Sequence, residues 1–383
     1  MRMNLDCAAG APLAPEVKQA MAQAMELVGN PSSVHRQGRA AQDVVERARA
    51  QVAALIGAKP DEVYFTSCGT ESNNWAIRGL LAANKRKGSH LIVSSIEHPS
   101  ILLLAKRFER DGMDVTYLPT TSEGLIGPET LRRALTSDTA LVSVMHANGE
   151  IGTIEPIAEL AVLAHEAGAL FHSDAVASVG HVPVHVRELG VDALSLAADQ
   201  FGGPAGAAAL YLKDGVRILP LLDGGGQETG GRSGTENLIG IAGLGVAAEL
   251  AAMQLAQRAA HERGLRDRLK AGLASLPGVR FSGSWTQRLS HSLHVCIEGL
   301  SSESLVLGLD QAGISVGLGS ACNSKAMRPS HVLKAMGLSD EQAQGALVLT
   351  VGSQTTAEEI DTALAEIARL VTRLRNVTAV TVR

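Results

Sequence analysis

The chain has 383 residues, of which 45% are hydrophobic, and this is enough to bury one large core and a second, smaller one. Its formal net charge at pH 7 is -5, and it contains no long basic or acidic run. This composition does not favour nucleic acid or a membrane surface as a partner, so small molecules and proteins are the expected partners.

Short β-rich runs alternate with longer helical patterns in the first half of the chain. Strands are predicted at 62–66, 90–94, 114–118, 140–144 and 169–173, with helical segments such as 73–83 and 157–167 between them. This alternation is typical of β-α-β units around a mostly parallel sheet.

The second half predicts long helices and a smaller α/β unit. Apolar residues from 239 to 276, continuing through the charged stretch 257–270, indicate helices that lead out of the sheet. Strands are expected at 279–282, 292–297 and 347–351, followed by a closing helix at 357–375. The predicted fold class is therefore α/β, with a large domain at 13–257 and a small domain made of 1–12 and 258–383.

Residues 1–15 show no targeting pattern, and no run approaches the about 20 apolar residues that a membrane span needs. The four cysteines, Cys7, Cys68, Cys296 and Cys322, are far apart and form no CxxC pair. This spacing is typical of reduced thiols rather than of a disulfide framework or a zinc site. We therefore expect a cytoplasmic protein without a metal site.

Polar segments follow several predicted strands, at the place where open α/β sheets bind their ligands. In the turn at 67–73, main-chain N–H groups and Thr70 could hold a phosphate, although such turns are also ordinary N-caps. His98, Asn148 and Asp174 lie in three further segments. Taken singly they could be a core histidine, a turn asparagine and a helix-capping aspartate. In this order they offer an aromatic face, an amide donor and a carboxylate, which together suit a pyridine ring.

The whole series of segments resembles the bacterial cysteine desulfurases of the NifS and IscS type, within the class V aminotransferase family that depends on pyridoxal phosphate (PLP). The matching segments are NPSSVH at 30–35, GTES at 69–72, EH at 97–98, NGEIG at 148–152, SDA at 173–175, GP at 203–204, GGGQE at 224–228, RSGT at 232–235 and GSAC at 319–322. The resemblance runs from about residue 5 to 361, and it implies the PLP-dependent transferase fold of the aspartate aminotransferase type.

The resemblance also implies a role for each matching residue. Thr70 would contact the cofactor phosphate, and His98 would stack on the ring. Asn148 would hydrogen-bond the ring oxygen, and Asp174 would face the ring nitrogen. Thr235 would reach a phosphate in the partner subunit, because two subunits complete each pocket in this family. A homodimer is therefore expected.

Cys322 matches the family's catalytic thiolate, which attacks the substrate sulfur and carries a persulfide. Lys325 and Arg328 follow it closely. They could lower the pKa of Cys322, bind an anion or a partner, or simply solvate a surface loop. Lys325 could also form the Schiff base with PLP in place of the family's lysine, which this chain lacks as described below. The cofactor would then have to be approached from the loop side.

The resemblance fails at the lysine that forms the Schiff base with PLP, within a family segment of the form Ser-x-His-Lys-x-x-Gly-Pro. Segment 195–204 instead places Asp199 at the histidine position and Gln200 at the lysine position. A carboxamide nitrogen is not nucleophilic, because its lone pair is delocalised into the carbonyl group. Gln200 can therefore neither form an imine nor act as the proton shuttle.

Other positions depart from the family in the same region. Ala177 replaces a glutamine that faces the ring oxygen, Ala197 a serine on the phosphate, and Thr229 an arginine. Ser353 replaces the arginine that clamps the substrate carboxylate, which is among the stronger hydrogen-bonded contacts. A lone lysine-to-glutamine change could be a laboratory substitution, but several correlated losses favour natural degeneration of the site.

Three functions fit these observations. We favour a pseudoenzyme that has no covalent cofactor and acts in sulfur transfer as an acceptor, a scaffold or a regulatory partner. Its partner would be a sulfur acceptor or an iron–sulfur cluster assembly scaffold. The second function is an active desulfurase or related lyase that uses non-covalently bound PLP. In the third, the pocket binds a different anion.

Overall fold

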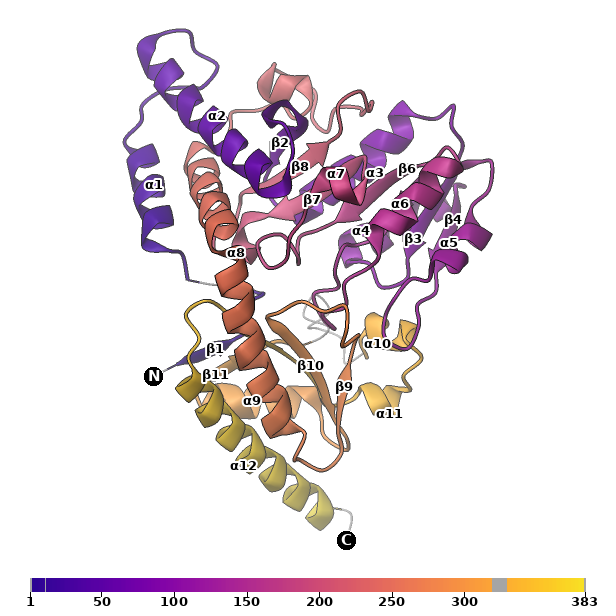
Figure 1. Cartoon of the computed structure of the whole chain (residues 1–383), viewed down its shortest axis with the longest axis vertical. Coiled ribbons are helices and arrows are strands. Elements are labelled where there is room, and N and C mark those ends of the chain that lie inside the picture. Colours follow the sequence, from indigo (N-terminus) through magenta and orange to yellow (C-terminus); the bar gives the residue numbers. More distant parts are fainter. Residues whose placement is uncertain (1, 11, 319–328, 382–383) are drawn as a thin grey trace.

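The computed structural model describes residues 2–10, 12–318 and 329–381. Its larger part is built on a seven-stranded sheet with the strand order β2-β8-β7-β6-β5-β3-β4 (Figure 1). The strands are β2 Val63–Thr66, β3 His90–Ser94, β4 Asp114–Leu118, β5 Thr139–Ser143, β6 Leu170–Asp174, β7 Ala193–Ala197 and β8 Ala208–Leu212. Only β8 runs antiparallel to its neighbours β7 and β2, so the sheet is mostly parallel, as predicted.

Both faces of this sheet are covered, and each face has its own core. Successive residues of a strand point to opposite faces, so Ile92 of β3 joins one core while Leu91 and Val93 join the other. The first core includes residues of α2, α5, α6 and α7, and the second includes residues of α3 and α4. These helices are α2 Arg36–Ile56, α3 Gly69–Ala83, α4 Pro99–Arg110, α5 Pro128–Ala134, α6 Ile157–Glu166 and α7 Val186–Leu189. This double covering explains why the central strands are continuous apolar runs.

A 36-residue helix, α8 (Leu238–Leu273), runs from the larger part of the molecule into the smaller part (Figure 1). Leu244 and Ala251 in its first half belong to the core beside the sheet, whereas Leu265 and Leu273 in its second half belong to a separate core. The domain boundary predicted between residues 257 and 258 therefore lies inside one continuous helix.

The smaller part contains a three-stranded antiparallel sheet with the order β12-β10-β9 and a two-stranded parallel sheet of β1 and β11. Its strands are β1 Met3–Leu5, β9 Val279–Ser282, β10 Ser292–Ile297, β11 Ile314–Val316 and β12 Ala346–Thr350. Its helices are α9 Ser302–Gln311, α10 His331–Ala335, α11 Asp340–Ala343 and α12 Ala357–Thr381. Pairing of β1 with β11 places the start of the chain in this part, before α1 (Pro15–Met25) returns to pack on α8.

Within the described part of the chain, α8 is the one helix that is long and apolar enough to cross a membrane. Half of its most apolar stretch is buried inside the structure, and α8 packs against α1 and α2. This degree of burial is typical of the core helix of a globular domain.

Candidate functional site

The predicted site residues lie at the carboxyl ends of strands, or in the segments that follow them, at one edge of the sheet. Strands β3, β5, β6 and β7 run parallel, and β2 has the same direction because both β2 and β7 are antiparallel to β8. Asp174 is the last residue of β6, and Thr70, His98, Asn148 and Gln200 lie in the segments that follow β2, β3, β5 and β7. This is the edge at which open α/β sheets bind ligands.

Asp174, at the end of β6, is buried and firmly held. Its Oδ2 accepts a hydrogen bond from Asn73 Nδ2 at 2.7 Å, and its Oδ1 accepts one from the Val176 N–H at 2.9 Å. Asn73 Nδ2 also donates to Ser100 Oγ, which lies 2.8 Å from His98 Nδ1. Burial raises the pKa of Asp174, and the two hydrogen bonds and nearby His98 oppose this effect. The structure therefore links two predicted cofactor residues, Asp174 and His98, through one hydrogen-bonded chain.

The start of α3 has features of an anion-facing helix end. Thr70 is exposed in the first turn, and the N-cap residue Cys68 makes no side-chain capping hydrogen bond. The glycine-rich segment 224–234 of the same chain packs against this turn, since Arg232 Nε lies 2.9 Å from Glu71 Oε1. Thr235, just beyond this segment, is exposed, and its approach to a partner subunit stays a prediction.

Asn148 is more engaged with the protein than its predicted role requires. Its Oδ1 accepts hydrogen bonds from the N–H groups of Glu150 and Ile151, and its Nδ2 donates to the Ile96 carbonyl at 3.0 Å. The other contact of Nδ2 is the Met145 sulfur at 3.4 Å, which is a weak acceptor. A ring oxygen could replace that sulfur without breaking the turn.

Gln200 closes the short helix Ala198–Gln200 that follows β7. Its side-chain Nε2 donates to the Ala8 carbonyl at 2.8 Å, and its own main-chain carbonyl lies 2.8 Å from His181 Nε2. Gln200 and Ser353 line the same small pocket, of about 60 Å³, together with Cys7. Gln200 and Ser353, which stand where the family has the Schiff-base lysine and the substrate-binding arginine, therefore line one pocket.

Two further departures, Ala197 and Ala177, lie at the same edge, and Thr229 lies in the short helix Gln227–Gly230. Ala197 is the last residue of β7. Ala177 packs beside Gly149, the neighbour of Asn148, since a Cβ added to Gly149 would lie 3.5 Å from the Ala177 Cβ. Thr229 and its neighbour Glu228 adopt positive φ angles of 54° and 49°. The buried Glu228 carboxylate fixes this conformation by accepting two hydrogen bonds from Arg49, at 2.8 and 2.9 Å.

Two buried glutamates, Glu97 and Glu155, and the partly buried Glu150 lie near this edge and were not assigned roles from the sequence. Burial raises the pKa of Glu97 well above its usual value, and nearby Asp174 adds to the effect. Burial also raises the pKa of Glu150 and of Glu155, each to about 8. Ser330 Oγ donates to Glu150 at 2.7 Å. Burial therefore shifts each of these carboxyl groups toward its protonated form.

Cys322, Lys325 and Arg328 lie outside the described residues, so their predicted roles stay predictions. Within the described part, the ring and phosphate positions fit PLP, because Asp174, His98 and the start of α3 offer the required groups at one edge. Gln200 does not fit the covalent link. Among the described residues, the position that matches the family's Schiff-base lysine therefore offers PLP no amine.

The geometry defines an α/β protein of the PLP-dependent transferase class, and comparison with known proteins supports this. Residues 3–362 match the family model "Aminotransferase class-V". The chain is 45% identical to "Cysteine desulfurase IscS" of Methanosarcina thermophila over 378 residues, covering 98% of this chain and 94% of the relative. It is 44% identical to the protein of the same name from Dictyoglomus turgidum, covering 97% and 95%.

Solved structures agree with this assignment. A NifS-like protein superposes with a TM-score of 0.91 at 35% identity, covering 97% of this chain and 100% of the other. A NifS-like protein from Rickettsia africae has a TM-score of 0.88 at 29% identity, covering 97% and 99%. The chain therefore belongs to the class V aminotransferase family and is similar to its cysteine desulfurases. Members of this family depend on PLP.

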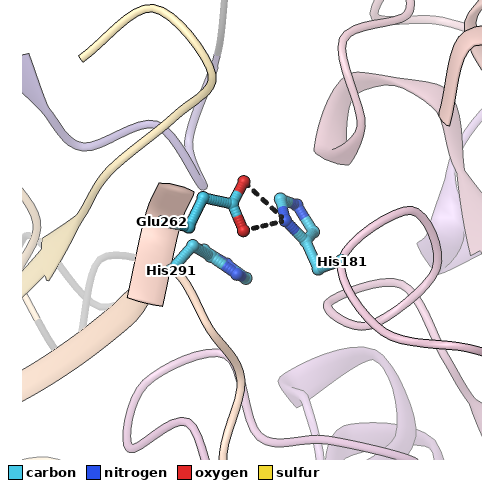
Figure 2. A group of neighbouring side chains, drawn as sticks. All are labelled: His181, Glu262 and His291. Carbon is cyan, nitrogen blue, oxygen red and sulfur yellow. Dashed lines mark hydrogen bonds and ion pairs between the residues drawn. The ribbon is translucent and has the colours of Figure 1, made fainter. Parts of the chain in front are cut away.

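The structure also brings together three residues that the sequence did not single out: His181, Glu262 and His291 (Figure 2). They come from the loop between β6 and α7, from α8, and from the residue before β10. No short motif joins them, so only the tertiary fold reveals the cluster.

Proposed function

We propose that this chain is a cysteine desulfurase relative that binds PLP without a covalent link, does not desulfurate free cysteine, and serves sulfur transfer as an acceptor, scaffold or regulatory partner. It acts as a homodimer in the cytoplasm. One observation carries the proposal. Gln200, just after β7, occupies the position where the resemblance places a lysine, and its side-chain amide donates a hydrogen bond to the Ala8 carbonyl.

PLP, when bound, supplies an electron sink, while the protein must position the substrate and move its proton. In this chain the Gln200 amide has no basic lone pair for the proton. Ser353 is exposed and offers one hydroxyl where the resemblance places the bidentate arginine. Substrate orientation and proton transfer are therefore both weakened in the same pocket.

A second candidate is an active cysteine desulfurase or related lyase that uses non-covalently bound PLP. This function is supported by the relatives at 45% and 44% identity, since both are named cysteine desulfurases. The intact hydrogen-bonded chain from Asp174 through Asn73 and Ser100 to His98 favours it as well, because that chain supports the ring on this protein's own residues.

Sulfide release from L-cysteine separates the two candidates. The purified protein is assayed with and without saturating PLP, beside a curated cysteine desulfurase as the positive control. The non-catalytic function predicts no sulfide above the rate of free PLP in either case. The active function predicts PLP-dependent release that Asp174→Ala abolishes.

The acceptor role is tested separately by incubating the protein with an active desulfurase and cysteine. Mass spectrometry should then find a persulfide on Cys322, and Cys322→Ser should remove it. A persulfide only on other cysteines would exclude Cys322 as the carrier, and no persulfide at all would exclude the acceptor role and leave the scaffold and regulatory roles.

A further inference from the structure

His181, Glu262 and His291 converge from three segments that are far apart in the chain, as Figure 2 shows. One potential ligand atom from each residue lies within 4.8 Å of the others. His181 Nδ1 is 3.4 Å from both carboxylate oxygens of Glu262. The two imidazole rings are stacked, with centroids 3.7 Å apart and an interplanar angle of 27°.

The neighbours of the cluster fix how two of its members present their atoms. His181 Nε2 lies 2.8 Å from the Gln200 carbonyl, which can only accept, so Nε2 carries the hydrogen. In the neutral imidazole, Nδ1 then directs a lone pair at the Glu262 carboxylate. Ser290 Oγ donates to Glu262 at 2.7 Å and holds that carboxylate in place. A lone pair facing a carboxylate is repulsive unless a proton or a metal ion lies between them.

His291 supplies a further lone pair. It is buried, and among the described residues its Nδ1 has no hydrogen-bond partner. Burial lowers its pKa well below the usual value, and nearby His181 and Arg266 add to this effect. A neutral imidazole of this kind is the form that coordinates a metal.

We propose that His181, Glu262 and His291 form a binding site for a divalent first-row transition-metal ion, with Zn²⁺ as the best match. Two imidazole nitrogens and one carboxylate oxygen are an established zinc ligand set. Outer hydrogen bonds, such as the one His181 donates to the Gln200 carbonyl and the one Glu262 accepts from Ser290, are typical of it. Donors around a tetrahedral Zn²⁺ lie roughly 3.3 Å apart, so the cluster contracts when the ion binds.

All three residues also line the pocket of about 60 Å³ that contains Gln200. Three protein ligands leave a coordination position open to water or a small ligand from that pocket. Two arginines lie nearby, but Arg266 is paired with Asp267 at 2.7 Å and Arg258 donates to the Phe201 carbonyl. The metal would join the loop carrying His181 to α8 and to the start of β10, and so connect the two parts of the molecule.

Zinc binding to the tag-free dimeric protein tests the proposal. The protein is stripped with EDTA, dialysed, and titrated with Zn²⁺ in competition with a chromophoric chelator. We expect one Zn²⁺ per chain, at least about 10-fold weaker binding in His291→Ala and in Glu262→Gln, and none above background in the double variant. His185→Ala is the matched control, because His185 is an exposed histidine outside the cluster. Its affinity should equal that of the unmodified chain.

Substoichiometric zinc in the unmodified chain, or unchanged affinity in both cluster variants, would overturn the proposal. Loss of zinc in Cys7→Ser but not in the cluster variants would also overturn it, since the ion would then sit on thiols. Circular dichroism checks that each variant is folded, and Glu262→Gln keeps an oxygen that can accept from Ser290. The titration contains neither PLP nor cysteine, so its outcome is independent of the proposed function.

Discussion

The side-chain amide of Gln200 donates a hydrogen bond to the main-chain carbonyl of Ala8, with 2.8 Å between nitrogen and oxygen. Ala8 lies between β1 and α1, so this bond ties the end of β7 to the N-terminal segment. A neutral donor that is already bonded to a main-chain carbonyl cannot become a nucleophile for an aldehyde. Two predictions follow from this relationship.

The first prediction is that PLP does not become covalently attached to the chain. Protein incubated with PLP and then reduced with borohydride should show no mass increase. Gln200→Lys should gain one reduced adduct, because Asp174, His98 and Thr70 remain to bind the ring and phosphate. An adduct on any lysine of the unmodified chain, Lys325 above all, would contradict the prediction.

The second prediction is that Gln200→Lys alone does not restore desulfuration at the rate of active family members. Imine formation, proton transfer and the substrate clamp act as a unit, and residues that act as a unit lose function non-additively. We expect higher sulfide release when Ser353→Arg, Asp199→His and Ala177→Gln are added to Gln200→Lys. Family-like turnover from the single change would show that the other departures are neutral.

The sequence predicted the central fold where turns and apolar runs are locally clear. The strands expected at 90–94, 114–118, 279–282 and 292–297 agree with the structure. The helices expected over 239–276 form one continuous helix, α8. The pairing of β1 with β11 was not predicted, because two three-residue strands more than 300 positions apart share no local pattern. Strands β7 and β8 were not predicted as elements: β7 overlaps the segment 195–204, which was interpreted only as the cofactor-lysine motif, and residues 208–212 were assigned to no element.

The sequence predicted which residues of the candidate site lie at one edge of the sheet, but not the hydrogen bonds that hold them. Parallel strands deliver the residues after their carboxyl ends to one edge, so chain order alone places Thr70, His98 and Asp174 together. The Asn73 amide that holds Asp174 was not predicted, because its direction depends on how α3 packs on the sheet.

The third prediction is that the protein is a homodimer in which Thr235 approaches the Thr70 turn of the second subunit. Light scattering should give twice the chain mass of 39.8 kDa. A cross-link between Thr235→Cys and Thr70→Cys should form between chains, in a Cys68→Ser background that removes the neighbouring thiol. A monomer in solution, or a cross-link only within one chain, would contradict the arrangement.

The fourth prediction is that Asn73→Ala destabilises the protein and weakens PLP binding. The change removes one donor from the buried Asp174 carboxylate, and such a loss costs about 1–3 kcal/mol in the free energy of unfolding. The loss should be smaller at pH 5 than at pH 8, because protonation removes the charge that needs the donor. Urea unfolding at both pH values measures it.

Asn74→Ala is the matched control for Asn73→Ala. Asn74 is the next residue in α3 and is half-buried, and its Nδ2 donates to the Thr70 carbonyl at 3.0 Å and to the Ser100 carbonyl at 3.4 Å, but not to Asp174. We expect a change below about 1 kcal/mol that does not vary with pH. Equal effects of the two substitutions would show that Asp174 gains nothing from Asn73.

The fifth prediction concerns the pH dependence of stability, and it rests on Glu155. This carboxyl is buried, its Oε2 accepts from the Ile126 N–H at 2.8 Å, and its Oε1 has no partner among the described residues. Burial raises its pKa from 4.5 to about 8. Between these two values the folded state binds a proton that the unfolded state does not bind. The stability that this group contributes is therefore present below pH 4.5 and is lost as the pH rises toward 8.

Glu155→Gln removes the titration, and the amide oxygen can still accept from Ile126. The two proteins should differ little at pH 5, and the variant should become the more stable one as the pH approaches 8, by an amount on the order of a few kcal/mol. Urea unfolding at intervals from pH 5 to 8 measures the difference, with the exposed Glu159→Gln as the control that shifts all points alike. Parallel curves for Glu155→Gln and the unmodified chain would mean that Glu155 is ionised in the folded state at neutral pH. The carboxylate would then need a donor for Oε1 beyond those in the described residues.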